Sequence, residues 1–240
     1  MKNLQRSGGL AALYLAVAYL VGLVLFIVVL DYVNITDAAQ KVALIVEKQM
    51  VFFATNLLLY VFFGIFLVIL ALALYDRLKA GAPALMQVAT VIGIIWAGSL
   101  VASGMISNAG LVPTAALYAV DPAQAALTWQ GIEIVADGIG NGNGEILGGV
   151  WILLVSLAAL RTGGLPKSLT ILGLLTGVVG IISLLPGLTD LVALFGLSQL
   201  VWYAWVGIVL LRSNPGRTPA TAWPLQSQEP ATSNAGPGSL

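Results

Sequence analysis

The chain has 240 residues, of which 59% are hydrophobic and only 8% are charged, and its mean hydropathy is +0.99. A soluble domain carries roughly a quarter charged residues, so this composition excludes an ordinary water-soluble protein and predicts one membrane domain. The ten basic and ten acidic residues cancel, which argues against a nucleic-acid partner. Because the chain has neither cysteine nor histidine, disulfides, Cys or His metal sites and Ser–His or Cys–His catalysis are excluded.

Six apolar runs approach or exceed the roughly 20 residues that a helix needs to cross the hydrocarbon core of a membrane. The predicted crossings are Gly9–Leu30, Met50–Tyr75, Ala84–Ser107, Ile146–Leu160, Ser168–Leu185 and Leu188–Leu211. The first run is longer than a signal-peptide core and no small-residue cleavage site follows it, so we expect an uncleaved span. The fourth run is the shortest, so we expect its helix to start before Ile146 and to draw Glu145 towards the membrane.

Two further helices are predicted between the crossings. Thr36–Gln49 has Asp37 and Lys41 four residues apart and apolar residues on another side, which is typical of an amphipathic helix. Asp121 followed by Pro122, with Gln124 three residues after the cap, predicts a second helix that runs to about Asp137, where Gly138 and Gly140 would end it. We expect this helix to lie on the outer membrane surface or to cap the bundle, with Trp129 near the interface.

The charged residues divide unevenly around the six crossings. If both termini are cytoplasmic, eight of the ten basic residues fall on the cytoplasmic side, where Lys and Arg near spans are retained. These are Lys2, Arg6, Arg77, Lys79, Arg161, Lys167, Arg212 and Arg217, and only Lys41 and Lys48 fall outside. The predicted fold class is therefore an all-α, polytopic bundle of six transmembrane helices over residues 1–212, with two extracytoplasmic amphipathic helices. Residues 213–240 are rich in Pro, Gly and Ser and predict a disordered cytoplasmic tail.

Several polar side chains fall within or beside the outer halves of the crossings. Polar groups are costly in lipid and tend to face the bundle interior or a wet cavity, so one hypothesis is an outward-facing polar vestibule. Its candidate residues are Asn56, Ser103, Glu145, Asp190 and Gln199. The alternative is that Ser99, Ser103 and Ser107 bond their own backbone carbonyls four residues earlier and that the acids are simply solvated.

Glycines mark two other features. Gly173, Gly177 and Gly180 follow one stripe of the fifth crossing, and this spacing favours close helix packing, within the bundle or at a dimer face. Asp137–Glu145 alternates glycine with oxygen-bearing side chains, but its spacing is not that of an EF-hand. We interpret this segment as a flexible link, with a calcium site as the alternative, and predict no metal and no cofactor.

Short motifs along most of the chain resemble the bacterial "domain of unknown function 4386" family of small six-span membrane proteins. The resemblance rests on Arg6-Ser-Gly-Gly-Leu10, Ala73-Leu-Tyr-Asp-Arg-Leu-Lys79, Gly144-Glu-Ile-Leu-Gly-Gly-Val-Trp151, and Gly164-Leu-Pro166 followed by Gly173. It implies a fold and a location in the bacterial inner (cytoplasmic) membrane, and it brings no catalytic residues.

The absence of His and Cys and of a soluble domain favours a non-catalytic accessory or binding protein rather than an enzyme. Such a protein acts through membrane lipid, through another membrane protein or through a second copy of this chain. The alternative function is a small-molecule transporter or channel that uses the polar vestibule. No charged residue lies near the centre of any predicted crossing, which weakens the case for a proton-coupled transporter.

Overall fold

The computed structural model describes residues 2–141, 145–188 and 190–212, and all of the regular structure in this part of the chain is helical. The all-α prediction is therefore confirmed for these residues. The predicted tail, 213–240, lies outside them. Four described helices are long and apolar enough to cross a membrane, and two more are apolar but shorter.

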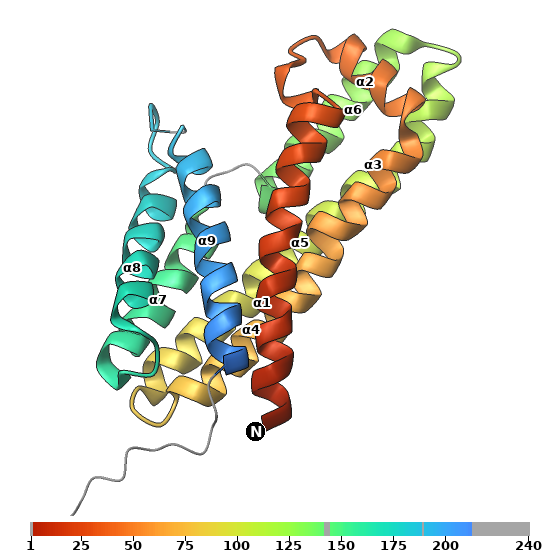
Figure 1. The fold of residues 1–240 in the computed structure, drawn as a ribbon. Helices are drawn as coiled ribbons and strands as arrows, with labels where there is room; N and C mark the ends of the chain where they lie inside the picture. Colours follow the sequence, from red (N-terminus) through yellow and green to blue (C-terminus); the bar gives the residue numbers. More distant parts are fainter. Residues whose placement is uncertain (1, 142–144, 189, 213–240) are drawn as a thin grey trace, which may run out of the picture.

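The first half of the chain forms tall helices that run along one side of the molecule (Figure 1). The first comprises α1 (Lys2–Leu23) and a π-helical continuation, η1 (Val24–Val29), so it begins seven residues before the predicted Gly9. The second comprises α3 (Gln49–Asn56), a π-helical segment η3 (Leu57–Phe62) and α4 (Phe63–Leu78). In both cases the helix is longer than the apolar run, because hydropathy marks only the part of a helix that is suited to lipid.

The third tall helix is much longer than its apolar run predicts. α5 extends over Pro83–Tyr118, 36 residues, whereas the predicted crossing ends at Ser107. At 1.5 Å per residue its length is about 54 Å, which exceeds the roughly 30 Å thickness of a hydrocarbon core. The helix continues through Pro113 because its distal part packs against another helix, α6.

The two predicted amphipathic helices form and pack together around the far end of α5. They are α2 (Ala38–Glu47), which leads into α3, and α6 (Pro122–Ala136). Asp121 caps α6 as predicted, its carboxylate accepting the backbone N–H of Gln124 over 3.0 Å. Asp37, which the sequence placed inside its helix, caps α2 in the same way and accepts the N–H of Gln40 over 2.8 Å. Together they cover a second, smaller core, which we call the distal core: Leu30, Val42, Ile45, Phe52, Leu111, Ala125, Ala126 and Trp129. Trp129 is 5% exposed, so it is a core residue rather than an interfacial one.

Two predictions around Glu145 are wrong in part. The α-helix α6 ends at Ala136, within one residue of the predicted Asp137, but Gly138 and Gly140 do not stop helical structure, because the chain continues as a π-helical segment, η4 (Asp137–Asn141). The next helix, α7 (Ile146–Thr162), does not start earlier than its apolar run, and Glu145 is its N-cap residue. Two smaller differences concern α8 (Lys167–Ile182) and α9 (Leu191–Arg212), which begin or end within three residues of the predicted crossings.

Helices α7, α8 and α9 group together beside the tall helices (Figure 1). We call the end of the molecule where α1 starts and α9 finishes the inner end, and the opposite one the outer end. The links from α4 to α5 and from α7 to α8 also lie at the inner end (Figure 1). The main core joins α1, α4, α5, α7, α8 and α9, and its largest fully buried side chains include Trp151, Trp202 and Tyr203.

Candidate functional site: a cleft between α1 and α9

α1 and α9 touch closely at the inner end and separate towards the outer end (Figure 1). The close contact depends on glycines: a Cβ atom on Gly207 of α9 would lie 3.0 Å from the backbone oxygen of Gly9 in α1. A Cβ on Gly196, three turns nearer the outer end of α9, would meet only the ring of Tyr19, at an ordinary 3.5 Å. The two helices therefore enclose no space at one end and diverge around a space at the other.

This space is a cleft of about 600 Å³. A volume of this size suits a ligand of several hundred daltons, since ligand pockets commonly measure about 300–1,000 Å³. Helix α1 with η1, the segment from η3 to Phe63, α5, η4 and α9 all contribute to its walls. The lining residues are Ala18, Tyr19, Gly22, Leu23, Phe26, Ile27, Leu59, Tyr60, Phe63, Trp96, Leu100, Gly140, Glu145, Ala193, Gly196, Leu197 and Leu200.

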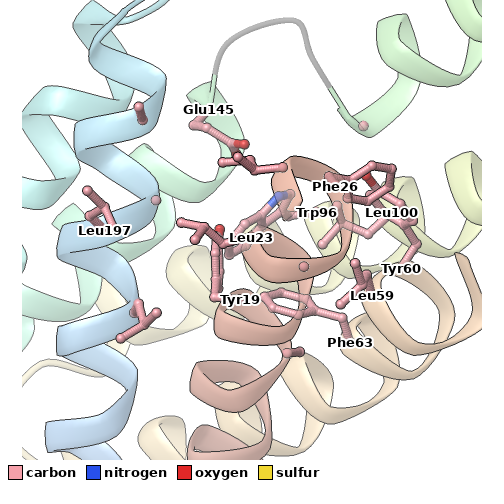
Figure 2. A pocket seen from close by; sticks show the side chains of 17 residues that line it. Tyr19, Leu23, Phe26, Leu59, Tyr60, Phe63, Trp96, Leu100, Glu145 and Leu197 are labelled. Atoms are coloured by element: carbon pink, nitrogen blue, oxygen red, sulfur yellow. The ribbon is translucent and has the colours of Figure 1, made fainter. Parts of the chain in front are cut away.

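The cleft wall is apolar apart from a few groups. Glu145 is the one charged residue among the 17 described residues that line it, and Figure 2 labels it among the apolar and aromatic side chains around the cleft. Leu23, Ile27 and Leu197 are 42%, 49% and 53% exposed, so the rim is apolar as well. An apolar rim between two apolar helices is typical of a cleft that faces lipid rather than water.

The floor of the cleft is a filled aromatic layer. Phe63 packs edge-on against Trp96, Tyr19 and Tyr203, with ring centroids 5.5–6.4 Å apart. The Tyr19 hydroxyl donates to Oε1 of Gln199 over 2.6 Å, and Nε2 of Gln199 donates to the Tyr203 hydroxyl over 3.2 Å. Gln199 is 0% exposed, so these bonds satisfy an amide that would otherwise be costly inside the bundle.

Glu145 has an unusual environment for a carboxyl group. It precedes the apolar helix α7, and burial raises its pKa to about 7. No side-chain hydrogen bond or ion pair joins it to another described residue. Glu145 is partly buried, and a carboxylate that is partly withdrawn from water without a described partner favours a proton or a bound cation.

A smaller chamber of about 120 Å³ adjoins the cleft and shares Trp96, Gly140 and Glu145 with it. Its wall adds a second acid, Asp137, from η4. Burial and then the nearby Glu133 charge raise the pKa of Asp137, while Lys41 lowers it. The Lys41 ammonium is 3.0 Å from Oε1 of Glu133, so this basic group is already paired with another carboxylate.

The structure separates the five residues that sequence patterns suggest for a polar vestibule. Only Glu145 lines the cleft. Asn56 donates to Oδ1 of Asn108 over 2.9 Å, Gln199 lies in the aromatic floor, Ser103 is 0% exposed, and Asp190 is exposed. A functional role for the five as one site stays a prediction.

The serine row behaves largely as the alternative interpretation expects. The Ser99 hydroxyl donates to the carbonyl of Ile95 over 2.9 Å, and the Ser107 hydroxyl to that of Ser103 over 3.0 Å. Ser103 differs, because its buried hydroxyl has no hydrogen-bond partner among the described residues. Two of the three serine hydroxyls therefore have hydrogen-bond acceptors within α5 itself.

The glycines of α8 lie against neighbouring helices of the same chain. A Cβ on Gly177 would lie 2.9 Å from the backbone oxygen of Gly149 in α7, and one on Gly180 would lie 2.6 Å from the ring of Phe195 in α9. Gly173 is also buried, between Ser156 and Trp202. The stripe is thus used for packing α7, α8 and α9 together.

The Asp137–Glu145 link is described only in part, because residues 142–144 lie outside the described residues. Within the described residues, no group of three or more acidic side chains is placed to hold a metal ion. The calcium alternative for this link stays a prediction. In comparisons with known proteins, no family model, no curated protein and no solved structure matches the chain.

Proposed function

We propose that this chain is a multi-pass membrane protein that acts by binding a membrane-soluble amphiphile in the cleft between α1 and α9, without catalysing a reaction. The observation that carries the proposal is the cleft itself: about 600 Å³, apolar in wall and rim, and open between two helices that are themselves suited to lipid. A ligand with a hydrocarbon chain fits such a wall because it buries apolar surface without leaving polar groups unpaired.

The proposed topology has six crossings with both termini in the cytoplasm of a bacterial cell. The four long helices, together with α7 and α8, supply the crossings, and the resemblance to a six-span bacterial family agrees with that number. The basic residues Arg77, Arg161 and Lys167 flank links at the inner end, which supports a cytoplasmic inner end.

The lack of Cys makes this topology simple to test. Single-cysteine variants Lys79→Cys at the inner end and Glu47→Cys at the outer end would be treated in intact cells with a membrane-impermeant maleimide. We expect labelling of the Glu47→Cys variant alone, with both variants labelled after the cells are broken. Labelling of Lys79→Cys in intact cells would contradict a cytoplasmic inner end.

Two features support binding over catalysis or conduction. The chain contains no His and no Cys, which removes the commonest general base and the thiol nucleophile. Below the cleft, the centre is filled by side chains such as Trp151, Trp202 and Tyr203, none more than 1% exposed, rather than by polar groups around water. The transporter or channel alternative needs a polar path, and it would be favoured by flux of a small solute into vesicles that contain only this protein.

Binding can be measured with radiolabelled dodecanol added to the protein in dodecyl maltoside micelles, with protein-free micelles subtracted. We expect saturable binding near one molecule per chain. Gly196→Leu should abolish it, because a leucine there projects into the cleft from a position where a Cβ has room. Gly98→Leu is the matched control, because Gly98 is exposed, a Cβ there would meet no atom within 4 Å, and the residue does not line the cleft. Binding that is absent, or equal in both variants, would overturn the proposal.

A further inference from the structure

The cleft and its side chamber differ in charge, and this difference indicates which amphiphile they suit. The wall of the cleft is mainly apolar, whereas the wall of the chamber contains Asp137 of η4 and Glu145 together with the indole of Trp96. Glu145 and Trp96, both labelled in Figure 2, border both spaces, so the chamber adjoins the part of the cleft that these two residues line. The arrangement separates a site for a chain from a site for a small head group.

We propose that the bound amphiphile carries a positively charged amine or quaternary ammonium head, which lies in the chamber between Glu145, Asp137 and Trp96. This inference rests on the proposed function, because it names the ligand of the same cleft. The chamber, about 120 Å³, has several times the roughly 30 Å³ that one water molecule occupies, so it can hold an ammonium group.

Charge complementarity supports a cation. No Lys or Arg is among the described residues that line either space, so the two acids have no basic partner there. Lys41 is the basic residue whose charge lowers the pKa of Asp137, and its ammonium group is already paired with Glu133 at 3.0 Å. A ligand cation would supply the missing partner for carboxylates that burial otherwise penalises.

Trp96 adds a second attraction for the same charge. An indole ring attracts ammonium groups within about 6 Å of its centre, and aromatic walls are a common means of binding quaternary ammonium. Trp96 is 3% exposed and is held by ring contacts with Phe63 and Trp151 at 6.4 and 5.9 Å. Its position is therefore set before a ligand binds, which lowers the entropy cost of recognition.

The same charges disfavour a phospholipid. A phosphate next to an ammonium head would bring a negative group towards two carboxyls that have no basic partner in the chamber. The chemistry that fits is thus an alkyl chain attached directly to a cationic nitrogen, without an intervening phosphate.

The test compares two probes with the same chain, dodecyltrimethylammonium and dodecanol, with the full-length protein in uncharged dodecyl maltoside micelles. We expect the cation to bind about tenfold or more tightly than the alcohol. Glu145→Gln should remove that preference while dodecanol binding stays unchanged, and Asp137→Asn should reduce it. Glu47→Gln is the matched control, because Glu47 is exposed and lines neither space.

The outcomes distinguish the inference of a cationic head group from the proposed function on which it rests. Equal affinity for both probes, or a preference for the cation that survives both Glu145→Gln and Asp137→Asn, would overturn the cationic head while dodecanol binding still supports the cleft. Failure of both probes to bind would overturn the proposed function itself. Displacement of the labelled cation by lysophosphatidylethanolamine as effectively as by dodecylamine would overturn the exclusion of a phosphate.

Discussion

The two ends of the α1–α9 pair use the same kinds of residues to opposite effect. At the inner end, Gly9 and Gly207 bring the helix backbones together, and no side chain has room between them. At the outer end, Gly22 and Gly196 line an open cleft, with only the side chains of Leu59 and Tyr19, respectively, near their Cβ positions. Glycine between helices therefore does not by itself produce close packing. The distance between the helices also depends on the layer of side chains packed next to the glycine.

That layer is the aromatic floor. Tyr19, Phe63 and Tyr203 hold the helices apart just above the point where the glycines bring them together. Rigid rings at a crossing act as a spacer, because protein interiors are close-packed and the rings cannot be compressed. Beyond the spacer the two helices diverge, and the cleft follows from this divergence.

Among the substitutions, the largest loss of stability is expected from a leucine at the inner end. Gly207→Leu would place a Cβ 3.0 Å from the Gly9 backbone oxygen and 2.8 Å from Leu13, and the rest of the side chain would force the helices apart. We expect a loss of about 1–3 kcal/mol in the free energy of unfolding. Gly196→Leu, the same change at the outer end, should leave stability nearly unchanged. Thermal denaturation in detergent measures the stability of both variants. Equal destabilisation by Gly207→Leu and Gly196→Leu would contradict the difference between the two ends of the α1–α9 pair.

A pH dependence of stability is expected from the outer end alone. Burial raises the pKa of Glu145 from 4.5 to about 7, so the folded protein keeps a proton that the unfolded chain has released. The free energy of unfolding is then highest below pH 4.5, falls as the pH rises to about 7, and levels off above it. The slope is at most about 1.4 kcal/mol per pH unit.

The measurement is the thermal midpoint as a function of pH, with Glu145→Gln as the control that should flatten the profile. Other titratable groups nearby are Tyr19, Tyr203 and Asp137. Phenols ordinarily lose their protons near pH 10, so the tyrosines stay neutral in this range. Asp137 has a raised pKa of its own, so the comparison is best repeated in an Asp137→Asn background. An unchanged slope in Glu145→Gln would contradict the assignment.

A smaller effect is expected from the polar link within the aromatic floor. Gln199→Leu would leave the hydroxyls of Tyr19 and Tyr203 without the amide that now joins them. We expect a loss of about 0.5–1.5 kcal/mol, since hydrogen bonds inside membrane bundles contribute modestly. Dodecanol binding should weaken in the same variant, because a looser floor changes the cleft. Full stability with unchanged binding would show that the rings alone act as the spacer.

The smallest effect is expected from the ion pair between α2 and α6, beside the distal core. Lys41 lies 3.0 Å from Glu133, with both side chains about a quarter exposed, and the Tyr32 hydroxyl donates to the same carboxylate over 2.9 Å. We expect Lys41→Met to cost about 0.2–1 kcal/mol. Hydrogen exchange should rise in α2 and not in α9. Faster exchange in α9 would show that the distal core and the cleft are coupled.

Sequence reasoning succeeded where the signal is local. Asp121 and Pro122 predict the start of α6 because the capping carboxylate and the backbone N–H that donates to it lie within three residues of each other. It failed for α5 beyond Ser107, where Asn108, Gly110 and Pro113 interrupt the apolar run although the helix continues. Packing against α6 outweighs local propensity there, and no pattern within α5 reveals that neighbour.

The candidate site was found only in part for a similar reason. Glu145 stands out in the sequence as an acid at the mouth of an apolar run. Its surroundings do not, because Tyr19, Trp96 and Leu197 come from helices far apart in the chain and look like ordinary apolar positions. The partners of Gln199 were missed in the same way: Tyr19 is 180 residues distant in sequence.

The central claim is that a hydrocarbon chain occupies the cleft, and quenching of Trp96 by a brominated amphiphile tests it most directly. Bromododecanol quenches indoles at contact, and Trp96 is the tryptophan that lines the cleft among the described residues. We predict a saturable quenching component in the native protein that disappears in Trp96→Phe and in Gly196→Leu, and that persists in Gly98→Leu. A saturable component that survives both Trp96→Phe and Gly196→Leu, or quenching that never saturates, would contradict the account.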